Sequence, residues 1–136
     1  MEPNWPYGYV YLAAFLPDSS EAIELIKKAL RLNPLPPPWY FTYLGLAYAR
    51  KGMYEEAIAA YKNGLQKAPD YFWNHLGLAS VNAILGREED AQSEVKEVLK
   101  INPNYSLACM AQIIQSYNDE AVKKRLSEGL AKAGLK

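Results

Sequence analysis

Residues 38–69 constrain the fold of this chain more than any other stretch. Large side chains in the first half recur at spacings of three and four, which place them on one face of a helix. They are Phe41, Leu44 and Tyr48. Gly52 interrupts the pattern, because glycine readily adopts the left-handed conformation that ends a helix. A second helix is predicted to stop before Pro69, since proline cannot continue it. The stretch therefore predicts two helices joined by a tight turn.

The same unit recurs along the chain. Its end is marked by Pro34, Pro69 and Pro103, which lie 35 and 34 residues apart. An alanine stands 12 residues before each proline, at Ala22, Ala57 and Ala91. Three second helices in register predict an all-α helical repeat. Pro3 lies 31 residues before Pro34, so residues 5–16 are expected to form a shortened first helix.

The unit resembles the tetratricopeptide repeat, which has about 34 residues and a set of marker positions. Counted from Pro38, the markers are matched by Phe41, Leu44, Gly45, Tyr48, Ala57, Tyr61, Gly64 and Pro69. The next unit departs from the pattern at His75, Asn82 and Val95. The resemblance implies an all-α superhelix of helix pairs with C-terminal capping helices. Small marker residues let neighbouring helices approach closely.

We expect a single domain over residues 1–136. It would comprise a shortened first repeat, two full repeats and a C-terminal capping pair, at residues 4–34, 38–69, 70–103 and 104–136. Within the capping pair, residues 105–115 are predicted to be helical. A final helix is predicted over about 120–133, with Asp119 as its N-cap.

Three strings resemble a more particular family: NPLPPPWYFTYLGLAYARKGMYEEAI, NPNYSLACM and YNDEAVKKRLSEGLAKAGL. They are similar to the C-terminal repeat region of bacterial proteins in which a class III adenylate or guanylate cyclase domain precedes tetratricopeptide repeats. The resemblance implies, as an alternative, a regulatory or dimerisation tail of a bacterial signalling protein. No cyclase segment is present in this sequence, so catalytic activity is not carried over.

Charge and cysteine content exclude several classes of function. Fifteen basic and fifteen acidic residues cancel, so no long-range field favours nucleic acid or an anionic membrane as a partner. There is no apolar run long enough for a spanning helix and no signal peptide pattern at the N-terminus. The one cysteine rules out an internal disulfide and suits a reducing compartment, which predicts a cytoplasmic protein.

Few residues in the sequence are candidates for catalysis or metal binding. The single histidine, His75, occupies a repeat marker where a packed ring is expected, and Cys109 lies in an apolar run that predicts a buried, inert thiol. No histidine pair has metal-ligand spacing and no glycine-rich loop could hold a phosphate. We therefore expect no enzyme activity, no cofactor and no metal site.

What remains is the concave face that the resemblance implies. The predicted contacts with a partner are Trp39, Thr42, Tyr43, Leu46 and Arg50 in the second repeat and Trp73, Leu76 and Ser80 in the third. Ala83 belongs to the same predicted face. Aromatic residues and arginine dominate binding hot spots, which favours a peptide, a helix or a second copy as the partner. Alternatively, the residues of the first helix and the C-terminal segment of this chain cover the face. The lysine and asparagine clamp that holds acidic C-termini in some family members is absent, so no such terminus is expected to bind.

Overall fold

The computed structural model describes residues 19–136, and all regular structure in that range is helical. The chain divides into two compact units between Pro69 and Asp70. The first unit contains α2 (Ser19–Leu32), α3 (Trp39–Arg50) and α4 (Tyr54–Lys67). The second contains α5 (Phe72–Leu85), α6 (Glu88–Ile101), η1 (Leu107–Met110), α7 (Ala111–Gln115) and α8 (Glu120–Lys132). The predicted helix over residues 5–16 lies outside the described residues.

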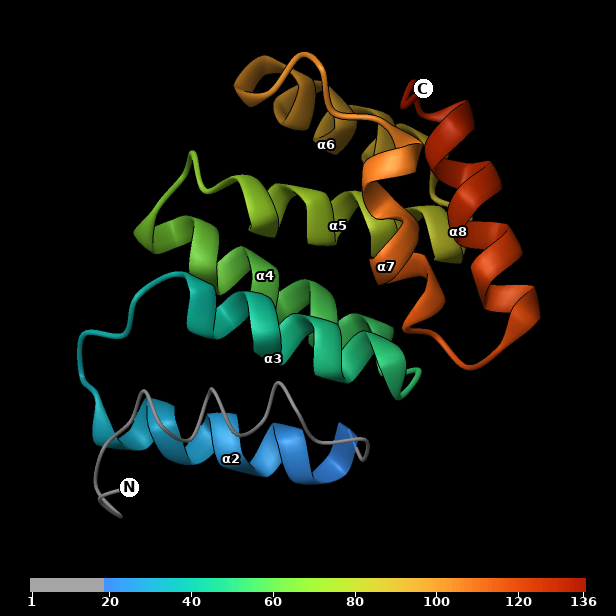
Figure 1. Ribbon diagram of the computed structural model, residues 1–136. Coiled ribbons are helices and arrows are strands. Elements are labelled where there is room, and N and C mark those ends of the chain that lie inside the picture. Colours follow the sequence, from blue (N-terminus) through green and yellow to red (C-terminus); the bar gives the residue numbers. More distant parts are fainter. Residues whose placement is uncertain (1–18) are drawn as a thin grey trace. The chain divides into compact units, whose positions relative to one another are not determined.

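The α3–α4 pair is built as the repeat pattern predicts, and α2 lies beside α3 (Figure 1). Gly52 has φ of 84°, and Met53 N donates to the carbonyl of Tyr48 at 2.9 Å, which closes the end of α3. Gly45 on α3 faces the ring of Tyr61 on α4. A Cβ atom at Gly45 would lie 2.5 Å from Cε1 of that ring, so the pair can approach this closely only without a side chain here.

The core of the first unit is shared by its three helices. Its buried members are Ala22, Ile23, Ile26, Leu44, Ala47 and Ala60. Lys27 lies at its edge, with Nζ 5.9 Å from the centre of the Tyr48 ring, so its charge lies over an aromatic face. Burial of one side chain such as Ile26 contributes about 1.5–3 kcal/mol, and the shared cluster explains why α2 stays on α3.

A proline-rich connector joins α2 to α3. Leu35 N donates to the side-chain oxygen of Asn33 at 3.1 Å, which turns the chain after α2. Pro38 has φ of −60° and ψ of −25°, already helical values, and proline is well suited to the start of a helix. Leu35 itself is 85% exposed.

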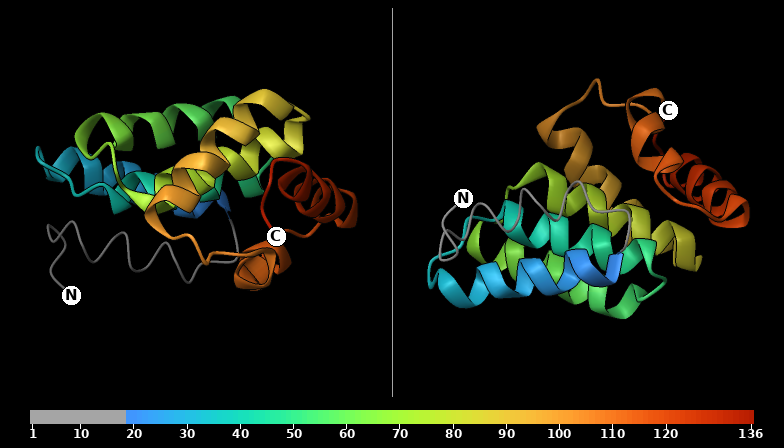
Figure 2. Two further views of the ribbon diagram at one scale, coloured as in Figure 1. Left: turned by 90° about the horizontal axis from the view of Figure 1, so that it is seen from above. Right: turned by 60° about the horizontal axis from the view of Figure 1, so that its bottom comes forward.

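In the second unit, α5 and α6 form another antiparallel pair, in which α5 is yellow-green and α6 is gold (Figure 2). Gly86 has φ of 77°, and Arg87 N donates to the carbonyl of Asn82 at 2.9 Å. The marker histidine is indeed a packed residue: His75 is 8% exposed and its Nδ1 lies 2.7 Å from Oε2 of Glu94 on α6. This contact ties the two helices together.

Residues 105–115 do not form the continuous helix predicted from the sequence. Ser106 is extended, with φ of −141° and ψ of 169°, and only a short η1 and the five-residue α7 follow. Because of this break, Met110 is buried while Cys109 is exposed. The prediction of a buried Cys109 is therefore wrong.

The last helix lies where a capping helix is expected. Asp119 caps α8, with Oδ1 accepting from Ala121 N at 2.8 Å, as predicted. Buried Val122, Leu126 and Leu130 lie on one side of α8, which contacts α5 and α6. At the contact, a Cβ atom on Gly129 would lie 2.7 Å from Cβ and 2.9 Å from the carbonyl oxygen of Ala83. The two helices therefore meet almost backbone to backbone.

Candidate functional site

One stripe of α3 is only partly used for packing. Trp39, Tyr43, Leu46 and Arg50 are spaced by four, three and four residues, which places them in a line along the helix. Tyr43 is 37% exposed, and the other three are partly exposed. Thr42 is also partly exposed. The opposite side of the helix is buried, so this stripe is the side of α3 on which a partner could pack.

Ring contacts hold the aromatic end of the stripe in place. The Trp39 ring meets Tyr40 edge-on at a centroid distance of 4.9 Å and Tyr43 at 6.0 Å. Tyr40 is fully buried, so it anchors the indole to the interior of the first unit. Such edge-to-face pairs contribute about 0.5–1.5 kcal/mol each beyond burial. Trp39 and Tyr43 therefore form a rigid apolar surface.

Arg50 ends the stripe with its only charge. Its Nε atom is buried and has no hydrogen-bond partner among residues 19–136. The terminal nitrogens are not buried in this way, and the residue as a whole is partly exposed. A guanidinium in this position can donate to an acceptor supplied from outside the described chain.

The predicted contacts on α5 differ from one another in exposure. Trp73 is 46% exposed and meets Phe72 edge-on at 4.9 Å, while Phe72 contacts Tyr105 at 5.0 Å. Leu76 and Ser80 are buried, and the Ser80 hydroxyl donates to the carbonyl of Leu76 at 2.8 Å. Their contact with a partner stays a prediction.

The C-terminal segment covers the end of α5. Ala83, which belongs to the predicted concave face, lies directly beneath Gly129 of α8. Within the second unit, the C-terminal segment therefore covers the predicted face at Ala83. The more accessible part of α5 is its N-terminal end, where Trp73 lies.

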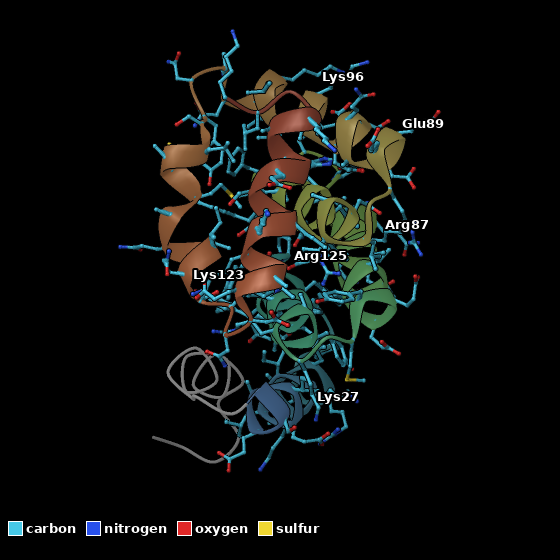
Figure 3. The ribbon with its side chains drawn as sticks, turned by 90° about the vertical axis from the view of Figure 1, so that its right-hand side faces the viewer. Lys27, Arg87, Glu89, Lys96, Lys123 and Arg125 are labelled. Atoms are coloured by element: carbon cyan, nitrogen blue, oxygen red, sulfur yellow. The ribbon has the colours of Figure 1, made fainter. Side chains whose placement is uncertain are left out.

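Sequence reasoning missed a small cavity of about 100 Å³ where α8 meets α5 and α6. Its polar lining is Asn82, Glu88, Arg125, Glu128 and Lys132. Figure 3 shows Arg125 on α8 facing the viewer. The spacing of the three charged residues on α8 by three and four could have indicated a shared face. Both signs of charge are present in equal number, so the lining selects neither an anion nor a cation.

No group of three or more histidine, cysteine and acidic side chains that could hold a metal gathers within residues 19–136. The hydrogen bond between Ser106 Oγ and Cys109 Sγ, at 3.5 Å, lowers the pKa of the exposed Cys109 thiol. Burial, together with the nearby Cys109 charge, raises the pKa of Tyr105 to about 12. None of the helices described is long and apolar enough to cross a membrane.

Comparison with known proteins finds similarity to a family of helical repeats. Residues 48–113 match the tetratricopeptide repeat family. The peroxisomal targeting signal receptor of Saccharomyces cerevisiae is 28% identical over 109 residues, which cover 78% of this chain and 18% of that receptor. This chain thus spans less than a fifth of that relative's length.

Two solved structures share the fold at low sequence identity. The first tetratricopeptide repeat domain of Spaghetti (RPAP3), bound to the HSP90 peptide SRMEEVD, has a TM-score of 0.72 and 17% identity, covering 88% of this chain and 98% of that one. The Sgt2 repeat domain from Aspergillus fumigatus has a TM-score of 0.71 and 18% identity, covering 96% and 80% respectively. These similarities confirm the predicted fold class. The family match over residues 48–113 and the shared helix-pair fold make this chain similar to tetratricopeptide repeat proteins.

Proposed function

We propose that this chain is a non-enzymatic protein interaction module that binds a segment of a partner protein on the exposed stripe of α3. Trp73 on α5 is proposed separately, as a partner contact of the second unit. The observation that carries the proposal is the rigid Trp39–Tyr43 surface, which is partly exposed although its rings are large and apolar. Apolar aromatic surface held in one conformation is the usual centre of a binding hot spot.

The similar proteins agree with this class of function. One solved neighbour is bound to a peptide, and one relative is a receptor for a targeting signal. The α3 stripe of this chain carries one cation and no asparagine, unlike a clamp for two carboxylates. We therefore infer a different peptide from the acidic C-terminus in that neighbour.

Removal of the anchors tests the proposal. Partner proteins would be captured from the source cell and the bound segment mapped, and that segment would be titrated against the variants. Trp39→Ala and Trp73→Ala should each weaken binding by about tenfold or more, since hot-spot truncations cost roughly 2 kcal/mol. Helicity by circular dichroism should not change. Leu35→Ala is the matched control, because Leu35 is more exposed than either tryptophan but lies on the connector. Unfolding of both tryptophan variants would show instead that the rings belong to the core.

Self-association on the same stripe is the alternative occupant. Light scattering would then give twice the mass of one chain, and Trp39→Ala would restore the single mass. A role as the regulatory tail of a bacterial cyclase-type signalling protein, a cytoplasmic location and the lack of nucleic-acid or membrane partners stay predictions. The coding sequence upstream of Met1 would test the first of these.

A further inference from the structure

We propose that the segment bound by α3 carries one acidic side chain, which pairs with Arg50, together with an apolar side chain that packs on Trp39. The inference rests on the function proposed above and names the chemistry of the partner. The two ends of the stripe then contribute differently, because the aromatic end provides affinity and the charged end fixes the direction and register of the bound segment.

The charge of Arg50 favours an acidic side chain in the partner. Arg50 is the only charged residue in α3, so no acidic side chain on that helix neutralises it. The neighbouring cation is already engaged, because Lys51 Nζ donates to Ser20 Oγ on α2. The α3 stripe therefore presents a single positive charge to whatever lies on it, and a carboxylate is the complementary group.

The partial burial of the Arg50 guanidinium also favours pairing with a carboxylate. Its Nε is buried without an acceptor in the described part of the chain, whereas most buried N–H groups in proteins have one. Since Nε is withdrawn from water, the guanidinium is less hydrated at its inner edge than that of a surface arginine. A carboxylate that accepts from this guanidinium would gain a charge-assisted bond with a fixed planar geometry.

The stripe is suited to one carboxylate within a segment rather than to the two carboxylates of an acidic chain end. Between Trp39 and Arg50, the residues of α3 that are not buried are Thr42, Tyr43, Leu46 and Tyr48, none of which is cationic. One guanidinium pairs fully with one carboxylate. We therefore commit to an internal aspartate or glutamate of the partner.

Geometry sets the spacing. Trp39 and Arg50 are eleven residues apart in α3, which corresponds to roughly 16 Å along the helix axis. An extended segment advances about 3.3 Å per residue, so about five residues separate its apolar and acidic side chains.

The test uses the full chain as bait for a displayed library of randomised ten-residue segments with Gly-Ser on both sides, so that no chain end is available. Selected segments should share an apolar residue and, at one fixed spacing from it, an aspartate or glutamate. Selection on Arg50→Gln should keep the apolar preference and lose the acidic one, and selection on Arg50→Glu should favour lysine or arginine instead. Arg31→Gln on α2 is the matched control, because it removes the same charge from an exposed position on another helix.

A titration cycle makes the result quantitative. With one selected peptide, Arg50→Gln should weaken binding about tenfold, as expected for the loss of one charge-assisted hydrogen bond. Replacing the acid of the peptide by its amide should weaken binding equally, and the two changes together should cost no more than either alone. Circular dichroism verifies that each variant is folded.

The outcomes separate this inference from the proposed function. Apolar enrichment without a fixed acidic residue, or the same acidic preference on Arg50→Gln, would overturn the pairing and leave the interaction module standing. Preference for a free acidic C-terminus when such peptides compete would overturn it as well. If no segment is enriched, both this inference and the proposed function are contradicted.

Discussion

Gly45 sets the distance between α3 and α4, and its replacement by alanine should destabilise the protein. The new Cβ would lie 2.5 Å from two atoms of the Tyr61 ring, which is 3% exposed and has no room to retreat. Overpacking costs about 1–3 kcal/mol, and the better helix propensity of alanine returns about 1 kcal/mol. We expect a net loss of up to about 2 kcal/mol in the free energy of unfolding, measured by urea denaturation.

A second substitution controls for the clash. In a Tyr61→Leu background the ring is gone, so Gly45→Ala should cost less than it does in the wild-type chain. If the cost is the same in both backgrounds, the ring contact is not what requires glycine at this position.

Cys109 gives a residue-scale prediction that depends on pH. The Ser106 hydroxyl bonds to its sulfur and lowers the pKa of the thiol, so the thiolate forms at lower pH than in an ordinary cysteine. Ser106→Ala removes the largest cause of this shift and should move the pH midpoint of the reaction with a disulfide reagent upward. The Ser106→Thr variant keeps a hydroxyl and is the control. Identical midpoints in all three proteins would contradict this assignment.

At the scale of elements, helix boundaries could be predicted where glycine and proline define them. The turn at Gly52 and the end of α4 before Pro69 follow from local chemistry, since left-handed backbone favours glycine and proline cannot continue a helix. The Asp119 cap of α8 was predictable for the same reason, because it depends on neighbours in sequence only.

Features that depend on distant residues were not predictable. The break at Ser106 lies in a stretch whose apolar spacing is typical of a helix. In the structure, however, Tyr105 is buried in contact with Phe72 and Met110, and neither contact can be read from the local spacing. The exposure of Cys109 follows from that break. Likewise, the side-chain contact between His75 and Glu94 joins residues 19 apart on different helices, and no local pattern specifies it.

For the candidate site, the sequence predicted which residues share the α3 stripe but not their surroundings. The repeat register alone places Trp39, Tyr43 and Arg50 on one side of the helix. That the Arg50 Nε is buried without an acceptor, and that α8 lies on Ala83, depends on packing between helices. Burial is a property of the assembled unit, so single-sequence patterns could not give it.

The contribution of the Asp119 N-cap to the stability of α8 can be tested by substitution. Asp119 Oδ1 accepts from Ala121 N at 2.8 Å and carries negative charge at the positive end of the helix. Asp119→Ala should cost about 1 kcal/mol and should raise the hydrogen-exchange rates of the first-turn amides of α8. Asp119→Asn keeps the acceptor and should cost less. Equal exchange rates in the alanine variant and the wild type would show that the cap does not hold this turn.

For the whole molecule, the division between Pro69 and Asp70 predicts that residues 70–136 fold on their own. The second unit has its own core, in which Val81, Val95, Val98, Leu126 and Leu130 are all completely or almost completely buried. Because α8 contacts both α5 and α6, these side chains are enclosed by helices of one unit. A domain of this size is only marginally stable, so we expect a cooperative thermal transition at a lower temperature than in the full chain.

The contribution of the capping helix α8 can be measured within that fragment. A version that ends at residue 118 lacks α8 and leaves the α5 and α6 side chains without their cover, so it should lose the cooperative transition seen by circular dichroism. In the 70–136 fragment, Gly129→Ala should lower the transition temperature, since its Cβ would meet the Ala83 carbonyl oxygen at 2.9 Å. Adding Ala83→Gly removes only the Cβ contact and should restore part of the loss. If 70–136 itself melts without cooperativity, the second unit depends on the rest of the chain and the stability of these helices is a property of the whole array.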